Sequence, residues 1–238
     1  MSEEGIRINK YLAECGICSR RGADELIARG AVMVDGVVAE NGMKIVPGMS
    51  VTVDGREVSG IDEKVYLAFN KPRGIVCTAE KSEERNVIDY LSYPKRITYS
   101  GRLDKDSEGL LIMTNDGDLI DAMMRSRNEH EKEYKVTVDK TITDASLYQL
   151  SKGVYLEELG VTTNKCKVTR LTDDSFEIIL TQGLNRQIRR MCETFGYRVR
   201  KLTRTRVMNI KLGELKSGEY RNLSEDEIRT LKRMCGAF

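Results

Sequence analysis

One polar loop holds the densest set of side chains that could do chemistry. Residues 101–109 read Gly-Arg-Leu-Asp-Lys-Asp-Ser-Glu-Gly and contain three acids, two bases and two glycines. The apolar run 110–113 follows directly, and a loop anchored by a buried strand often carries function. An ionised carboxylate such as Asp104 can act as a nucleophile or as a general base. Paired with Asp106 or Glu108 it could also cleave a glycosidic bond, whereas a polar loop by itself is more often only a loop.

A second segment, residues 186–206, is strongly basic. It has eight cationic side chains against one acid, Glu193; the cations are Arg186, Arg189, Arg190, Arg198, Arg200, Lys201, Arg204 and Arg206. Such a cluster favours a surface that faces phosphate groups, although a solvated protein face has the same composition. The net charge of the whole chain, 39 − 37 = +2, says little about nucleic acid.

Histidine and cysteine give no pattern for a metal site. The single histidine, His130, excludes a multi-histidine site, and its charged surroundings predict an exposed, solvated ring. Cys15 and Cys18 have the spacing of a zinc or redox pair, but no second pair exists, so we interpret them as packing residues at a turn between helices. The six cysteines are expected to be reduced thiols.

The elements that position these groups fall into two parts. Residues 6–28 predict two short helices, with Ser19 as the N-cap of the second and Gly30 after its end. Hairpins with turns at Asp35-Gly36 and Asp54-Gly55 follow. From Val65 onward, short β-rich runs dominate, with helices between them. The predicted strands are 65–69, 75–78, 110–113, 134–138 and 176–180, and the predicted helices are 87–91, 118–125 and 186–195.

We therefore expect an α+β protein with domains at residues 1–61 and 62–238. No apolar run approaches the ~20 residues of a membrane helix, and residues 1–4 lack the order of a signal peptide. The expected location is the cytoplasm.

The N-terminal part resembles the S4 RNA-binding module. The resemblance lies in three segments: residues 7–13 (Arg-Ile-Asn-Lys-Tyr-Leu-Ala), 18–21 (Cys-Ser-Arg-Arg) and 30–36 (Gly-Ala-Val-Met-Val-Asp-Gly). It implies a small α/β module in which four cations lie near an RNA backbone, namely Arg7, Lys10, Arg20 and Arg21. The alternative is an unrelated helical hairpin with surface arginines.

The second part resembles the RsuA-type ribosomal RNA pseudouridine synthases. Gly-Arg-Leu-Asp at 101–104 and Ser-x-Gly-Leu at 107–110 are similar to the active-site signature of that family, and its Asp falls on Asp104. Three further segments match in the same order: 71–74, 131–134 and 183–191. Residues 128–134, 163–168 and 204–209 are most similar to the RluF-type branch, which acts on a uridine of large-subunit ribosomal RNA. The resemblance implies a catalytic domain on a mixed, mainly antiparallel sheet.

The resemblance also implies roles at the site. Asp104 would be the catalytic carboxylate, Arg189 the cation that keeps it charged through bidentate pairing, and Tyr134 the ring that stacks on the uracil. Five residues would surround or bind the substrate: Arg102 fills the space left by the extruded base, Ile188 packs below the pocket, Lys71 supports the loop, and Arg186 and Arg190 contact the RNA backbone.

The implied reaction breaks the N-glycosidic bond of uridine and rejoins the base through C5. No metal and no cofactor are required. The sequence leaves open whether Asp104 attacks C1′ or C6 or deprotonates C2′. The expected partner is a structured stem-loop of ribosomal RNA, with 23S RNA as the first choice and tRNA as an alternative, bound by a monomer without a membrane or a small-molecule cofactor. A non-catalytic S4-type RNA-binding protein and a nucleoside or glycoside hydrolase are the competing interpretations.

Overall fold

A computed structural model describes residues 5–125 and 130–237. These residues form two compact units. The first comprises the described chain up to Val65 with Pro94–Arg96 and Asn115–Gly117, and the second comprises Tyr66–Tyr93, Ile97–Thr114 and the described residues from Asp118 onward. The predicted domain boundary at residues 61 and 62 stays a prediction. Asn128 and Glu129, which belong to one of the resemblance segments, lie outside the described residues.

The first unit begins with the two predicted helices, α1 (Ile8–Glu14) and α2 (Arg20–Ala28). Ser19 is the N-cap of α2, because its hydroxyl oxygen accepts a hydrogen bond from the Gly22 amide at 2.9 Å. A hydrogen bond of 2.9 Å from the Asn9 side chain to the Asp24 carboxylate joins the two helices. Cys15 is buried in the core beneath them, as its packing interpretation requires.

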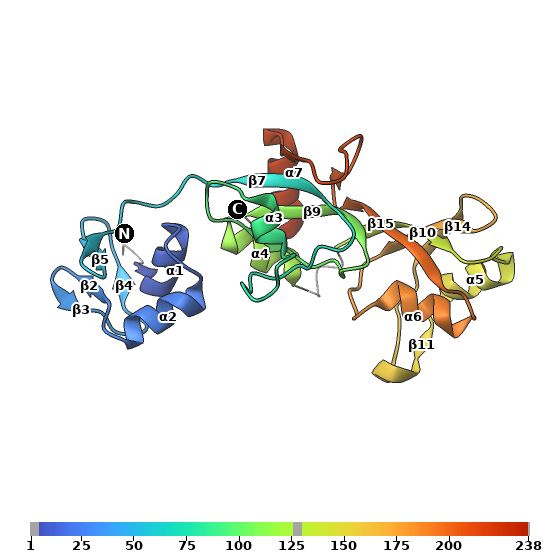
Figure 1. The fold of residues 1–238 in the computed structure, drawn as a ribbon, viewed down its shortest axis with the longest axis horizontal. Helices are drawn as coiled ribbons and strands as arrows, with labels where there is room; N and C mark the ends of the chain where they lie inside the picture. Colours follow the sequence, from blue (N-terminus) through green and yellow to red (C-terminus); the bar gives the residue numbers. More distant parts are fainter. Residues whose placement is uncertain (1–4, 126–129, 238) are drawn as a thin grey trace. The chain divides into compact units, whose positions relative to one another are not determined.

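Short hairpins complete the first unit (Figure 1). An antiparallel sheet has the order β3-β2-β5-β6, and a separate pair joins β1 to β4. The bounds are β1 (Ile6–Arg7), β2 (Val32–Val34), β3 (Val37–Val38), β4 (Lys44–Ile45), β5 (Val51–Val53) and β6 (Arg56–Glu57). Both predicted turns are confirmed: Asp35 and Gly36 have φ of 49° and 81°, and Asp54 and Gly55 have φ of 46° and 77°, as two-residue hairpin turns require.

The second unit is built on one large sheet. Its described strands run β13-β14-β10-β15-β9-β7-β17, with β16 paired to β15 and β8 paired to β9. The pair β9 and β15 is parallel and the other described pairs in this sheet are antiparallel, which confirms a mixed, mainly antiparallel sheet. The bounds are β7 (Tyr66–Lys71), β8 (Thr98–Ser100), β9 (Glu108–Thr114), β10 (Lys132–Val138), β13 (Lys167–Arg170), β14 (Ser175–Leu180), β15 (Val199–Val207), β16 (Ile210–Lys211) and β17 (Tyr220–Asn222).

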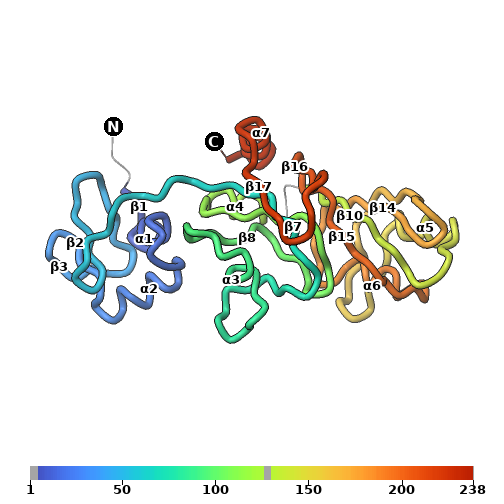
Figure 2. Tube along the Cα trace, turned by 45° about the horizontal axis from the view of Figure 1, so that its top comes forward, coloured from blue at the N-terminus to red at the C-terminus, as the bar shows by residue number. Residues whose placement is uncertain are grey.

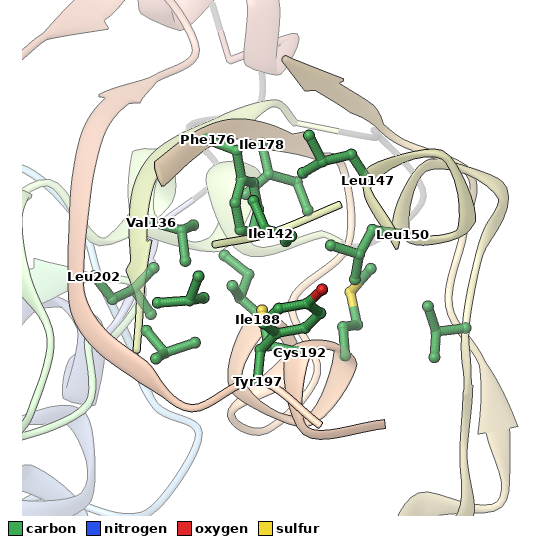
Figure 3. Packing of buried hydrophobic residues seen from close by; sticks show 14 of the residues in the cluster. Val136, Ile142, Leu147, Leu150, Phe176, Ile178, Ile188, Cys192, Tyr197 and Leu202 are labelled. Atoms are coloured by element: carbon green, nitrogen blue, oxygen red, sulfur yellow. The ribbon is translucent and has the colours of Figure 1, made fainter. Parts of the chain in front are cut away.

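Two hydrophobic clusters hold helices to this sheet. One joins β7, β9 and β16 to α4 (Gly117–Met124) and α7 (Glu225–Cys235). The other joins β10, β14 and β15 to α5 (Asp144–Lys152) and α6 (Gln187–Thr194). Figure 3 shows the second cluster, in which Ile188 and Cys192 of α6 lie with Val136 and Leu202 of the sheet. The remaining elements are α3 (Val87–Leu91), β11 (Tyr155–Leu156), η2 (Glu157–Leu159) and β12 (Val161–Thr162).

Two predictions about local structure are wrong. Residues 75–78 do not form a strand; Val76 makes only an isolated bridge to Asn86, and the Ile75 carbonyl is used by the Lys71 side chain. His130 is not exposed but buried, at 7% relative exposure, because its Nε2 forms a hydrogen bond of 3.2 Å with the Ala122 carbonyl of α4. The prediction was based on the charged neighbours of His130 in the sequence, which do not indicate that its ring is buried.

Within the described residues, none of the helices has both the length and the apolar character needed to cross a membrane. All six cysteines have free thiols.

Candidate active site

Asp104 lies in the loop between β8 and β9, where main-chain contacts fix the backbone. The Ser107 amide donates to the Asp104 carbonyl at 3.0 Å, and Ser107 is buried. Leu103 is also buried, and its amide donates to the Cys77 sulfur at 3.4 Å. Asp104 itself is half-buried and Arg102 is exposed. The loop thus has a fixed backbone and presents polar side chains at the surface.

Lys71 stabilises a neighbouring loop from inside the protein. Its side chain is fully buried, and Nζ donates to the carbonyl oxygens of Pro72 at 2.9 Å and Ile75 at 2.7 Å. The Gly74 amide in that loop donates to the Lys105 carbonyl at 2.7 Å, one residue after Asp104. Burial lowers the pKa of Lys71, while the negative charges of Asp104 and other nearby groups act in the opposite direction. The support predicted for Lys71 is therefore exerted through backbone carbonyls.

Arg189, on α6, reaches the same loop. Its Nη2 donates to the Asp106 carbonyl at 2.9 Å, and Nη1 donates to the Val199 carbonyl at 3.1 Å. Burial, followed by repulsion from Arg186, lowers the pKa of Arg189, and the charges of Asp106 and Asp104 oppose this shift. The expected bidentate ion pair with Asp104 is not present in this structure, and the hydrogen bonds of both terminal nitrogens go to main-chain oxygens. Arg189 thus contacts the loop that contains Asp104 through the Asp106 carbonyl.

Ile188 and Tyr134 belong to the same apolar cluster. Ile188 is buried in the cluster of β10, β14 and β15, and Tyr134 packs against that cluster while remaining half-buried. On β10, Tyr134 is opposite Ile178 of β14 on one side and opposite Arg204 of β15 on the other. Its ring therefore has both an apolar contact and access to solvent.

Arg204 is a site residue that the sequence alone did not reveal. It is only 2% exposed; Nε donates to the Leu110 carbonyl at 2.7 Å and Nη1 to the Arg102 carbonyl at 3.4 Å. Its Nη2 is buried without a hydrogen-bond partner among the described residues, as is Nε of Arg189. In the sequence Arg204 was one of eight cations, and only the pairing of β15 with β9 reveals that it lies beneath the Asp104 loop.

The basic run does not form one phosphate-facing surface. Arg189 and Arg204 are buried, Lys201 pairs with Glu108 at 3.0 Å, and Arg206 pairs with Glu131 and Glu133. These side chains serve the fold or the loop because β15 runs through the middle of the sheet. The alternative interpretation, a solvated protein face, does not describe the whole run either, because Arg189 and Arg204 are buried.

The two arginines predicted to contact RNA differ. Arg190 forms an ion pair with Glu158 and donates to the Asn185 carbonyl. Arg186 is exposed and precedes α6 in the left-handed region, with φ of 50°. Exposure makes Arg186 the more accessible of the two for a phosphate.

Of the four cations predicted to bind RNA in the first unit, Arg7, Arg20 and Arg21 are exposed and Lys10 is half-buried. Arg20 and Arg21 occupy the first turn of α2, where the free amide groups of the helix also attract anions. Among the described residues, no group of three or more His, Cys, Asp or Glu side chains is placed to hold a metal ion.

The comparison with known proteins decides the family. The family model described as RNA pseudouridylate synthase matches residues 65–194, which is more than half of the chain. This chain belongs to that family. The S4 domain model matches residues 6–51, so the RNA pseudouridylate synthase fold is preceded by an S4 domain, as predicted.

Known pseudouridine synthases are similar in sequence to this chain along nearly its whole length. The dual-specificity RNA pseudouridine synthase RluF of Salmonella typhi is 49% identical over 98% of this chain and 81% of the relative. The ribosomal large subunit pseudouridine synthase B of Bacillus subtilis strain 168 is 35% identical, with 96% of each chain covered. A solved pseudouridylate synthase crystal structure has a TM-score of 0.69 and 27% identity over 95% of this chain and 99% of that one. The chain is therefore an RNA pseudouridine synthase, and the resemblance to the RsuA-type family is confirmed.

Proposed function

We propose that the protein converts a specific uridine of ribosomal RNA, in the large-subunit 23S RNA, to pseudouridine, with Asp104 as the catalytic carboxylate. The relatives named RluF and large subunit synthase B support the substrate class. The observation that supports the residue assignment is the fixed backbone of the loop around Asp104. The Gly74 amide holds the Lys105 carbonyl and Arg189 holds the Asp106 carbonyl, while Lys71 stabilises the neighbouring loop that contains Gly74.

The reaction is an isomerisation. The bond between N1 and C1′ breaks, the base turns, and a bond between C5 and C1′ forms; the proton lost from C5 is balanced by one gained at N1. An ionised Asp104 assists by attack on C1′, by attack on C6, or by removing the proton at C2′. Arg189 and Arg204 are buried cations that donate to carbonyl oxygens of the Asp104 loop, and Lys71 is a buried cation that donates to the neighbouring loop.

The target base must leave its stack before Asp104 can reach the sugar, at a cost of a few kcal/mol. We assign Tyr134 to recover part of that cost by stacking, which is worth about 1–3 kcal/mol per base. We assign Arg102, which is exposed two residues before Asp104, to occupy the vacated space. Ile188 supports the Tyr134 ring from the buried cluster.

Affinity for RNA comes from the S4 unit and from Arg186. In this proposal Arg7, Lys10, Arg20 and Arg21 contact phosphates, which supplies binding and orientation with little reading of sequence. A chain with these groups and an inactive second unit would be only an RNA-binding protein. The presence of Asp104, Tyr134 and Arg189 favours an active enzyme over an RNA-binding protein without catalysis.

The decisive assay uses ribosomal RNA transcripts that carry tritium at C5 of uridine. Wild-type protein should release tritium while the base stays on the RNA, and a hydrolase would instead release free uracil. Asp104→Asn should abolish release and keep RNA affinity within about tenfold, because the charge serves chemistry and backbone contacts serve binding.

Asp106→Asn is the matched control, since Asp106 is an exposed acid of the same loop. It should retain most activity. Comparable activity in Asp104→Asn and wild type would show that another carboxylate is responsible. A tRNA transcript belongs in the same assay, because the names of the RluF relatives state dual specificity.

A further inference from the structure

Arg204 lies on β15, the middle one of three neighbouring strands; β10 carries Tyr134, and β9 follows the loop that carries Asp104. On β15 it is opposite Tyr134 of β10 in the antiparallel pair and opposite Gly109 of β9 in the parallel pair. Figures 1 and 2 both show β15 beside β10. Directly opposed residues of an antiparallel pair have their side chains on the same face, with Cβ atoms about 4.5–5.5 Å apart. Arg204 is therefore the cross-strand neighbour of the proposed stacking residue.

The side chain of Arg204 also contacts the loop that carries Asp104. Nη1 donates to the Arg102 carbonyl before Asp104, and Nε donates to the Leu110 carbonyl after it, at 3.4 and 2.7 Å. Both contacts are to main-chain oxygens on either side of the carboxylate. One buried guanidinium thus spans the loop from its first residues to the start of β9.

The backbone of Arg204 is held closely as well. A Cβ placed on Gly109 would lie 2.4 Å from the carbonyl oxygen of Arg204 and 2.7 Å from its amide nitrogen. This approach brings the end of the Asp104 loop against β15 at the residue whose side chain holds that loop. Side chain and main chain of Arg204 therefore act on the same segment.

The charge of Arg204 is not neutralised by a carboxylate in direct contact. Its hydrogen-bond partners in the described structure are main-chain carbonyls, and Nη2 is buried without one. A buried donor without a partner costs stability, and such groups often have a role other than stability. Here the buried guanidinium contacts the loop that carries Asp104.

We propose that Arg204 is a positioning residue that fixes the Asp104 loop relative to Tyr134. This inference rests on the proposed roles of Asp104 and Tyr134. It requires an arginine, because a guanidinium presents several donors in a planar fork, whereas the single ammonium of lysine cannot reproduce that geometry. Arg204 touches neither the substrate nor the reacting atoms in this scheme and acts through the loop.

The test compares Arg204→Met and Arg204→Lys with wild type, Asp104→Asn and Arg221→Gln, all as full-length protein. Arg221 forms a bidentate ion pair with Glu227, in a part of the unit with no proposed role at the site. Its variant is the control for loss of a hydrogen-bonded arginine away from the proposed site. Single-turnover rates and RNA affinity are measured on 23S transcripts, with near-UV circular dichroism and thermal unfolding to report the fold.

Arg204→Met should lower the single-turnover rate about 100-fold, because small displacements of a catalytic group cost about that much. Arg204→Lys should also be slow, though less so, and both should bind RNA within about threefold of wild type. Arg221→Gln should lose stability and keep its rate.

A rate within threefold of wild type in Arg204→Lys would overturn the inference, and so would an equal loss of rate and affinity. Failure of both Arg204 variants to fold would overturn it too, since Arg204 would then be a residue of the core. If Asp104→Asn is inactive and the Arg204 variants are not slow, only the positioning role fails. If Asp104→Asn is active, the proposed function fails first.

Discussion

Gly109 of β9 and Arg204 of β15 approach each other so closely that no side chain fits between their backbones. Gly109 has a φ of 106°, and a Cβ there would meet the carbonyl oxygen of Arg204 at 2.4 Å. The close approach therefore explains why the Ser-x-Gly-Leu segment has a glycine at this position. It allows a loop that ends in a buried strand to lie directly against the strand that carries Arg204.

Replacement of Gly109 by alanine should disturb both stability and activity. The methyl group meets backbone atoms, which cannot rotate away, and the positive φ adds about 1–3 kcal/mol of strain. We expect a clear fall in the urea midpoint and a slower tritium release. Gly160→Ala is the matched control, because Gly160 also has a positive φ, 63°, but no atom lies within 4 Å of the place its methyl group would take; it should keep full activity. Equal effects of the two changes would refute the close-approach argument.

Lys71→Met should destabilise the protein and slow the reaction. Methionine keeps most of the volume but leaves the Pro72 and Ile75 carbonyls without their donor. A buried polar group that loses its partner costs about 1–3 kcal/mol. Denaturant unfolding and single-turnover rates measure the two effects. Lys135→Met, at an exposed position of β10, should change neither, and an unaltered Lys71→Met variant would show that the loop needs no internal support.

Two substitutions of Tyr134 should distinguish a stacking role of the ring from a role of the hydroxyl group. Tyr134→Phe keeps the ring and should retain RNA affinity, whereas Tyr134→Leu loses a contact worth about 1–3 kcal/mol. We expect Tyr134→Leu to reduce kcat/KM by about 10-fold to 100-fold, in line with that energy. If phenylalanine and leucine are equally impaired, the hydroxyl group and not the ring face is what the reaction uses.

The S4 unit should govern the salt dependence of RNA binding. Loss of one phosphate contact reduces the slope of log K against log salt by about 0.7–0.9, so Arg7→Gln with Arg21→Gln should reduce it by roughly twice that amount. Fluorescence anisotropy at several salt concentrations gives the slope. The control is Arg29→Gln, since Arg29 is an exposed arginine of the same unit that already pairs with Asp54 at 2.9 Å. An unchanged slope in the double variant would contradict the predicted RNA contacts.

Glu227 gives a prediction for pH. Hydrogen bonds from Arg221 are the main cause that lowers the pKa of Glu227 below its usual 4.5. A depressed pKa in the folded state stabilises the protein above the unfolded value, and this contribution disappears as pH falls through the folded value. Glu227→Gln should therefore be less stable than wild type at pH 7 by about 0.5–1 kcal/mol, a modest figure because both side chains are partly solvated.

Urea unfolding of both proteins at pH 7 and at successively lower pH below 4.5 checks this expectation. The two free energies of unfolding should converge as Glu227 takes up its proton. A constant difference across the series would mean that the carboxylate charge is not what stabilises α7.

Local sequence determined the small elements and the order of the motifs. The N-cap at Ser19 and the turns at Asp35-Gly36 and Asp54-Gly55 depend on neighbouring residues alone, so they were predictable. The loop containing Asp104 could be singled out for the same reason, since its acids and glycines are contiguous and lead into an apolar strand. The family signature in this loop can be recognised from the order of the residue types alone.

Tertiary structure decided which charges are buried and what they contact. His130 and Arg204 lie in charged stretches of sequence yet are buried, because each has a carbonyl partner that the fold supplies. His130 meets the Ala122 carbonyl of α4, and Arg204 meets the Leu110 carbonyl, 94 positions away in the chain. Arg189 was predicted to pair with the Asp104 carboxylate and instead holds the Asp106 carbonyl. Strand register sets the contact of Arg204, and its neighbours in the sequence do not encode that register, since the pairing of β15 with β9 joins segments about a hundred positions apart.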